Sequence, residues 1–274
     1  MCLLLSVWLL VFGAVAQAET QGVLTRAHAH NDYWHTRPLL DALDHGFASV
    51  EADVFLVDGK LLVGHDPTEL RPERTLAALY LEPLRDRVRQ NGGSAFGEGT
   101  PVTLLVDFKS EAGPTYKALA KELVAYAEMT GQMAEGQWQR GAVEVVISGN
   151  RPIELATEDA GRQAAIDGRL VELGRNPSVD LVPLVSESWQ SHFRWDGRDE
   201  MTAVEREKLR EMTELVHRGG RRLRFWASPE TEACWVELRA AGVDLIGTDD
   251  LAGLAGFLNQ DEEKAKGSEI NTGR

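Results

Sequence analysis

Two carboxylates lie within an otherwise apolar stretch of the chain, Ser49-Val50-Glu51-Ala52-Asp53-Val54. Such apolar surroundings are typical of a β-strand buried on both faces, as in a parallel sheet covered by helices. Residues two apart on a strand point to the same side, so Glu51 and Asp53 face one cavity. Two carboxylates that face one way repel each other unless a cation lies between them. The stretch therefore predicts a metal site on a buried strand.

Similar apolar stretches alternate with helical patterns along the 274 residues of the chain. Strands are predicted at residues 23–28, 48–54, 102–107, 142–147, 170–173, 181–184, 222–226 and 245–247. Helices are predicted at residues 38–45, 72–89, 115–130, 152–165, 204–217, 230–241 and 251–258. The length suits one α/β barrel or two smaller domains, but no repeat or shift in composition marks a second domain. About eight strand–helix alternations favour a parallel sheet or a closed barrel.

Three histidines are predicted to lie at strand ends beside the carboxylates. His28 and His30 follow the first strand and, being two residues apart, point together. The pair Asp58-Gly59 predicts a tight hairpin turn that brings His65 back beside Glu51. Because histidine changes its charge near neutral pH, these three residues are the candidate acid and base catalysts.

A third carboxylate follows the strand at residues 102–107, in Asp107-Phe108-Lys109. Three carboxylates from two strands form an oxygen-rich set that suits Mg²⁺ or Ca²⁺ rather than zinc. Lys109 is expected either to form a buried salt bridge or to contact a substrate phosphate. Asn150 and Trp226 are further candidates for substrate binding, although an aromatic residue such as Trp226 equally suits the core.

Other residues receive a structural interpretation. Cys234 lies in a helical pattern and is expected to pack in the core rather than to act as a nucleophile. Asp249 or Asp250 is expected to cap the helix at residues 251–258. The formal net charge of −14 would repel a nucleic-acid backbone, so no nucleic-acid partner is expected.

The two ends of the chain differ from the rest in composition. Residues 1–18 carry no charge, contain an apolar run over residues 3–15 and end in Ala16-Gln17-Ala18. We interpret them as a signal peptide, and an uncleaved anchor or a buried helix is the alternative. Cleavage would leave no stable membrane span and would place the barrel domain, residues 19–260, in the periplasm or outside the cell. The polar tail at residues 261–274 is expected to be disordered.

The order of these motifs resembles the superfamily of glycerophosphodiester phosphodiesterases and phosphatidylinositol-specific phospholipase C-like enzymes. Four segments resemble more closely its branch named for altered inheritance of mitochondria protein 6: His28-Ala29-His30-Asn31-Asp32-Tyr33-Trp34, Ser49-Val50-Glu51-Ala52-Asp53-Val54, Arg71-Pro72-Glu73-Arg74-Thr75 and Thr248-Asp249-Asp250-Leu251. The resemblance covers nearly the whole chain after residue 18. It departs from the phosphodiesterase pattern because His28-Ala29-His30 replaces His-Arg-Gly and the Glu-Asn-Thr segment is absent.

The resemblance implies a TIM-type (β/α)8 barrel in a single domain. It implies metal ligation by Glu51, Asp53 and Asp107, and acid–base catalysis by His65 with either His28 or His30. Lys109 matches a lysine of the sphingomyelinase D-like members. We therefore expect a hydrolase, or a cyclising lyase, that acts on a glycerophosphodiester or a phospholipid-like substrate. Two alternatives are a metal-dependent hydrolase with His28 and His30 as ligands, and a non-catalytic binding protein that keeps the barrel.

Overall fold

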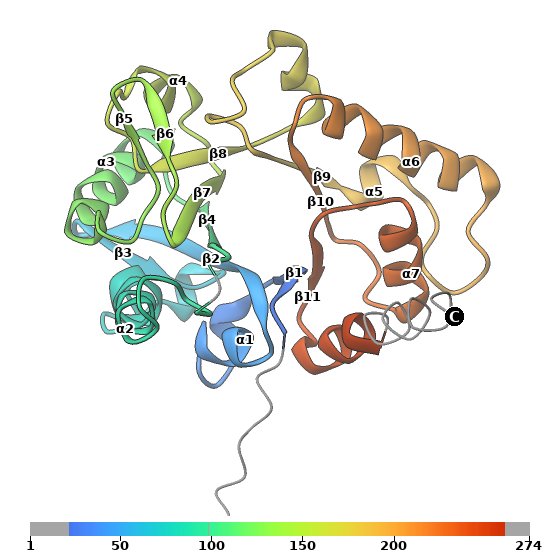
Figure 1. The fold of residues 1–274 in the computed structure, drawn as a ribbon, viewed down its shortest axis with the longest axis horizontal. Coiled ribbons are helices and arrows are strands. Elements are labelled where there is room, and N and C mark those ends of the chain that lie inside the picture. Colours follow the sequence, from blue (N-terminus) through green and yellow to red (C-terminus); the bar gives the residue numbers. More distant parts are fainter. Residues whose placement is uncertain (1–21, 98, 261–274) are drawn as a thin grey trace, which may run out of the picture.

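The computed structural model describes residues 22–97 and 99–260 of the chain. In these residues eight strands form a nearly closed barrel with helices around it (Figure 1). The barrel strands, in chain order, are β1 (Leu24–Ala29), β2 (Phe47–Val57), β4 (Val102–Phe108), β7 (Val143–Gly149), β8 (Ala164–Gly168), β9 (Leu184–Ser188), β10 (Arg222–Trp226) and β11 (Ile246–Thr248). Neighbouring strands pair in parallel, and one bridge between Arg224 and Leu245 links β10 to β11. The predicted TIM-type barrel is confirmed.

Helices lie on the outside of this barrel (Figure 1). The α-helices are α1 (Leu40–Asp44), α2 (Glu82–Gln90), α3 (Ala112–Leu123), α4 (Ile153–Glu158), α5 (Trp189–His192), α6 (Ala203–Arg218), α7 (Glu232–Ala240) and a last one at residues 251–260. Short 3₁₀ turns are η1 (Asp32–Trp34), η2 (Pro67–Glu69), η4 (Val124–Tyr126) and η5 (Leu170–Arg175), and η3 (Ala77–Leu81) is a π-helix. Cys234 is buried within α7, as expected of a packing residue.

Capping side chains fix where several helices begin. Thr202 and Thr231 accept hydrogen bonds from backbone N–H groups at the starts of α6 and α7. Asp250 Oδ1 accepts one from Gly253 N at 2.9 Å, so Asp250 caps the last helix as predicted. Asp249 is thereby left for another role.

The barrel strands are buried on both sides, which explains their continuous apolar character. Outward-facing residues pack against the helices in the main core. Inward-facing residues form a smaller cluster made of Leu105, Val146, Ala165, Leu184 and Leu245. Because Leu105 and Asp107 lie two apart on β4, the apolar interior continues into polar groups at the carboxyl ends of the strands.

A hairpin extends β2 beyond the barrel. β3 (Lys60–Val63) pairs with β2 in antiparallel fashion, and Asp58 and Gly59 form the turn with φ values of 49° and 78°. Positive φ at both positions is the signature of a tight hairpin turn, so the predicted turn is confirmed. A second hairpin, β5 (Gln132–Ala134) with β6 (Gln137–Gln139), was not predicted.

The middle of the chain departs from the predicted elements. The helix predicted at residues 152–165 ends at Glu158, and β8 begins at Ala164. The strand predicted at residues 170–173 is the 3₁₀ turn η5, and the strand predicted at residues 181–184 is β9, shifted to Leu184–Ser188. Alanine favours a helix, but β8 pairs with β7 and β9 and buries Ala164 and Ala165, and these tertiary contacts override the local preference.

The predictions for residues 1–18 and 261–274 lie outside the described residues and stay predictions. Among the helices of the described part, none combines the length and the apolar character needed to span a membrane.

Candidate active site

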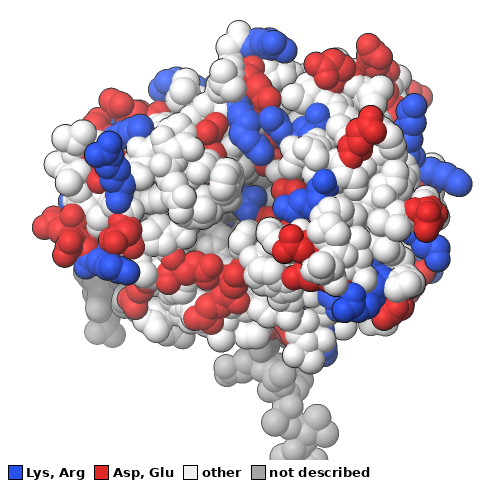
Figure 2. Space-filling view, turned by 180° about the vertical axis from the view of Figure 1, so that it is seen from behind, with Lys and Arg blue, Asp and Glu red and all other residues white. Residues whose placement is uncertain are grey.

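A cavity of about 460 Å³ lies where the barrel strands end. Predicted site residues line it, namely His30, Glu51, His65, Asp107, Lys109, Asn150 and Trp226. The two others, His28 and Asp53, hydrogen-bond to residues of this lining. Figure 2 shows a hollow near the middle of the face opposite to that in Figure 1, with acidic and basic side chains around it. Parallel barrel strands all end at one edge, so residues distant in sequence converge there.

Three carboxylates converge at this cavity. Oxygen atoms of Glu51, Asp53 and Asp107 all lie within 4.8 Å of one another. Gly149 leaves room for them, because a Cβ at this position would lie 2.3 Å from Asp107 Oδ1. The Oδ1 atom of Asp53 is buried and has no hydrogen-bond partner among the described residues, which is costly unless a ligand binds it. The set therefore fits a divalent cation such as Mg²⁺ or Ca²⁺.

The protein compensates the charges of these carboxylates only in part. Burial, together with the charge of Glu51, raises the pKa of Asp107 to about 6 and also raises the pKa of Asp53. Burial would raise the pKa of Glu51 too, but the charge of Arg224 and the hydrogen bond from His28 bring it below its usual value. A further positive charge near Asp53 and Asp107 would therefore be favourable.

Lys109 lies beside two of these carboxylates. Its Nζ is 3.0 Å from Asp53 Oδ2 and 3.1 Å from Asp107 Oδ1. Burial alone would lower the pKa of Lys109, but Asp107 and Asp53 raise it above its usual value. Of the two roles that the sequence left open, the structure shows the ion pair, and a contact with a substrate phosphate stays a prediction.

The two histidines of the His28-Ala29-His30 segment lie in different surroundings. His28 is fully buried, with Nδ1 2.8 Å from Ser49 Oγ and Nε2 3.0 Å from Glu51 Oε2. Burial and the charge of Arg224 lower the pKa of His28 to about 4. His30 instead lines the cavity. Both nitrogens of His28 are hydrogen-bonded. His28 and His30 therefore do not present two free imidazole nitrogens to one metal ion, as the alternative with these histidines as ligands requires.

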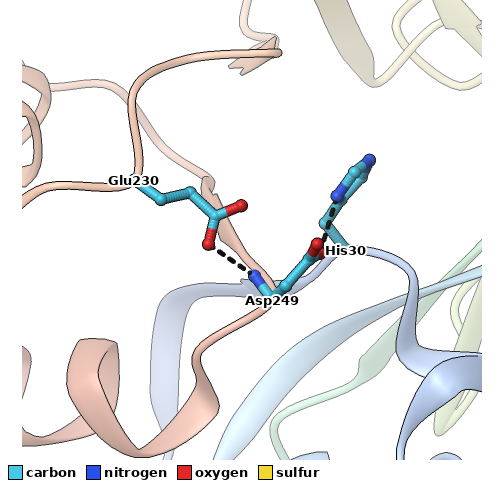
Figure 3. Close-up of side chains that lie close together, drawn as sticks. All are labelled: His30, Glu230 and Asp249. Carbon is cyan, nitrogen blue, oxygen red and sulfur yellow. Dashed lines mark hydrogen bonds and ion pairs between the residues drawn. The ribbon is translucent and has the colours of Figure 1, made fainter.

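His30 is held by a carboxylate that follows the last barrel strand (Figure 3). Its Nδ1 is 2.8 Å from Asp249 Oδ1, and the backbone N–H of Asp249 donates to Glu230 Oε2 at 2.9 Å. Burial would lower the pKa of His30, but the hydrogen bond to Asp249 raises it overall. These three side chains also have ligand atoms within 4.8 Å of one another. Because both carboxylates are exposed and hydrogen-bonded, we interpret them as support for His30 rather than as a second metal site.

His65 follows β3 and is half exposed at the cavity. Its Nδ1 is 3.0 Å from Asp53 Oδ2, which also accepts a hydrogen bond from the Tyr33 hydroxyl at 2.8 Å. The Trp34 ring packs against the imidazole at an angle of 61°, with 5.9 Å between ring centroids. An ionised Asp53 accepts from Nδ1–H, so Nε2 is the nitrogen that can exchange a proton with a ligand.

The rest of the cavity lining contains two predicted substrate-binding residues and two arginines that were not predicted. Trp226 is 44% exposed at the cavity, so it is part of the wall rather than of the core. Asn150 lines the cavity too, and its Nδ2 donates to Ser110 O at 2.8 Å. Arg169 and Arg224 also line the cavity, and sequence reasoning missed both. A signal for Arg224 existed, because it precedes Trp226 by two residues and so shares its strand face.

A barrel with carboxylates and histidines at the carboxyl ends of its strands places its site where TIM barrels bind and transform ligands. Residues 18–166 match the family model of the AIM6-like phosphodiesterase domain. The chain belongs to this family, and the relationship that the sequence motifs predicted is confirmed.

Similar proteins agree with this assignment. The chain is 32% identical to altered inheritance of mitochondria protein 6 of Eremothecium gossypii, over 86% of this chain and 70% of that protein. It is 27% identical to a homolog of that protein in Arthroderma benhamiae, over 87% of this chain and 86% of that protein. A glycerophosphodiester phosphodiesterase from Parabacteroides distasonis has a similar fold, with a TM-score of 0.50, 15% identity, and 90% of this chain and 100% of that chain covered.

Proposed function

We propose that this chain is a metal-dependent phosphodiesterase that hydrolyses or cyclises a small or lipid-linked phosphodiester at the cavity. One observation carries the proposal: three carboxylates, one with an unpartnered buried oxygen, converge beside His30 and His65. Membership of the AIM6-like phosphodiesterase domain family supports the reaction class.

Glu51, Asp53 and Asp107 would hold the cation. When bound, it supplies positive charge that neutralises a phosphate oxygen as negative charge develops around phosphorus. Oxygen ligands favour Mg²⁺ or Ca²⁺ for this role.

His65 and His30 would transfer the protons. Asp53 holds Nδ1 of His65, so Nε2 of His65 takes the proton from the attacking hydroxyl. Asp249 raises the pKa of His30 and so favours the protonated ring that donates to the leaving alkoxide. Attack by water gives hydrolysis, whereas attack by a hydroxyl of the substrate gives a cyclic phosphate.

The test is turnover of a phosphodiester panel by the protein with Mg²⁺, with Ca²⁺ and with a chelator. The panel contains glycerophosphodiesters, lysophospholipids and bis(p-nitrophenyl) phosphate, and ³¹P NMR separates cyclic from open products. We expect turnover that requires the metal and falls at least about 100-fold in His65→Gln.

His192→Gln is the matched control for this experiment. His192 Nε2 lies 2.8 Å from Glu187 Oε2, so it is another histidine–carboxylate pair, but it is not part of the cavity lining. We expect its turnover to equal that of the wild type. A folded protein that binds no metal and cleaves no diester would contradict the proposal and favour a binding protein.

A further inference from the structure

Arg224 is a buried cation inside the candidate site. It lies on β10 and is 3% exposed, yet it lines the cavity. Its Nη2 donates to Glu51 Oε2, the same oxygen that lies 3.0 Å from His28 Nε2. Arg224 thus links β10 to a carboxylate on β2, across the barrel from its own strand.

Most of the hydrogen-bonding capacity of Arg224 is unused. A guanidinium group carries five N–H donors in a planar fork. Glu51 takes one of them, and the buried Nε has no hydrogen-bond partner among the described residues. A buried donor without a partner is costly, and guanidinium groups pair with phosphate oxygens especially well. These unused donors therefore point to an anionic ligand in the cavity.

The formal charges favour the same ligand. Glu51, Asp53 and Asp107 carry three negative charges, and Lys109 and Arg224 carry two positive ones. Arg169 also lines the cavity, but Asp167 neutralises it at 2.9 Å. The protein alone would therefore repel a phosphate. A divalent cation on the carboxylates would turn the total to one positive charge, which matches the single negative charge of a phosphodiester. Without Arg224 that total would be zero.

Lys109 is less available than Arg224 to bind a phosphate. Its ammonium group is engaged by both Asp53 and Asp107, at 3.0 Å and 3.1 Å. Arg224 bonds a single carboxylate and keeps several donors.

We propose that Arg224 binds a phosphate oxygen of the substrate directly, in addition to holding Glu51. The inference rests on the phosphodiesterase function proposed above. It assigns the recognition of the diester anion to β10, a strand that contributes none of the carboxylates.

Arg224→Gln and Arg222→Gln form a matched pair for the test. Both arginines lie on β10 and face the same way, but Arg222 lines a separate cavity and donates to Thr103 Oγ1 at 3.1 Å. Inorganic phosphate is titrated calorimetrically into the Ca²⁺-loaded proteins, and Ca²⁺ is titrated separately. We expect the phosphate Kd to rise about 10-fold to 100-fold in Arg224→Gln and to stay unchanged in Arg222→Gln.

Two further readouts separate substrate binding from a purely structural role. Arg224→Lys should restore part of the phosphate affinity that Arg224→Gln loses. The Ca²⁺ affinity of Arg224→Gln should equal or exceed that of the wild type, because a nearby positive charge is removed. Equal phosphate affinity in the two glutamine variants, or weakened Ca²⁺ binding in Arg224→Gln as its only defect, would overturn the inference. Wild-type turnover of bis(p-nitrophenyl) phosphate with an unchanged KM in Arg224→Gln would overturn it as well, while leaving the proposed function intact.

Discussion

Both ends of the barrel hold a cavity with charged side chains, but the charges are satisfied differently. At the amino-terminal end, a cavity of about 320 Å³ is lined by Glu144 and Arg222 among others. Both carboxylate oxygens of Glu144 accept hydrogen bonds, from Trp138 Nε1 at 2.9 Å and from Gly141 N at 3.1 Å. At the carboxyl end, buried atoms of Asp53 and Arg224 have no hydrogen-bond partner among the described residues.

This difference shows that a cavity does not by itself identify a functional site. Charged groups with satisfied hydrogen bonds can serve the fold alone. Buried polar atoms without partners cost free energy, so those of Asp53 and Arg224, which lie beside the cluster of three carboxylates, indicate a ligand that completes them. Substitutions at matched positions of the two ends should therefore have very different consequences.

Glu51→Gln should have the largest effect. It removes one negative charge from the cluster of three carboxylates, so we expect metal-dependent turnover to fall about 1000-fold or more, with weaker cation binding. Glu144→Gln is the counterpart at the other end and should leave turnover unchanged. Activity assays with calorimetric metal titration measure both effects, and equal losses in the two variants would contradict the comparison.

Substitution of the two neighbouring histidines should have the next largest effects, and the two variants should lose different properties. His30→Gln should lower kcat by about 100-fold to 1000-fold without weakening metal binding, because His30 lines the cavity and is the proposed proton donor. His28→Gln should mainly weaken metal binding, since buried His28 contacts Glu51. Steady-state kinetics and metal titration measure both effects. A kcat that fell only in the His28 variant would assign the proton donor to His28 instead of His30.

Asp249→Asn should have a smaller effect, because Asp249 acts through His30. Loss of the hydrogen bond that raises the pKa of His30 should lower kcat about 10-fold. In the proposed mechanism the protonated ring is the active form, so a lower pKa of His30 should move the alkaline limb of the kcat–pH profile to lower pH. Glu230→Gln, which keeps the His30–Asp249 contact, is the control. An unshifted alkaline limb in Asp249→Asn would contradict the role of Asp249.

Much of the barrel was predictable from sequence because its strands are continuous apolar runs. The turn at Asp58-Gly59 was equally clear, since both positions need positive φ. The helix predicted at residues 152–165 is wrong at its end, where helix-favouring alanines form β8, a choice made by packing in the barrel rather than by local preference.

The carboxylates of the site were predictable because each interrupts an apolar strand. The role of Asp249 was not, because it depends on a contact with His30, which is 219 residues away in the chain. The position of Arg224 on the strand face of Trp226 was readable from sequence, but its contact with Glu51, 173 residues away, was not. Sequence spacing also could not separate His28 from His30. A strand face places both histidines on one side, but depth in the barrel decides which one reaches the cavity.

The smallest expected effect is on the stability of the metal-free protein, and Asp107→Asn measures it. In wild-type protein with chelator, burial and Glu51 raise the pKa of Asp107 to about 6, so its ionised form disfavours the folded state above that pH. We expect the variant to be more stable at pH 8 by about 1–2 kcal/mol in urea unfolding, and the gain to vanish in acid below the unfolded pKa of about 4.

A bound divalent cation should reverse the difference in stability between the wild type and Asp107→Asn. Ca²⁺ or Mg²⁺ binds the folded wild type more tightly than the variant and so stabilises the wild type more. Asp180→Asn, an exposed aspartate of the amino-terminal cavity, should show neither the gain nor the reversal. A wild type that is already more stable than Asp107→Asn in chelator would mean that Lys109 fully compensates the cluster. The carboxyl end would then resemble the amino-terminal end, where charge is satisfied by the protein itself.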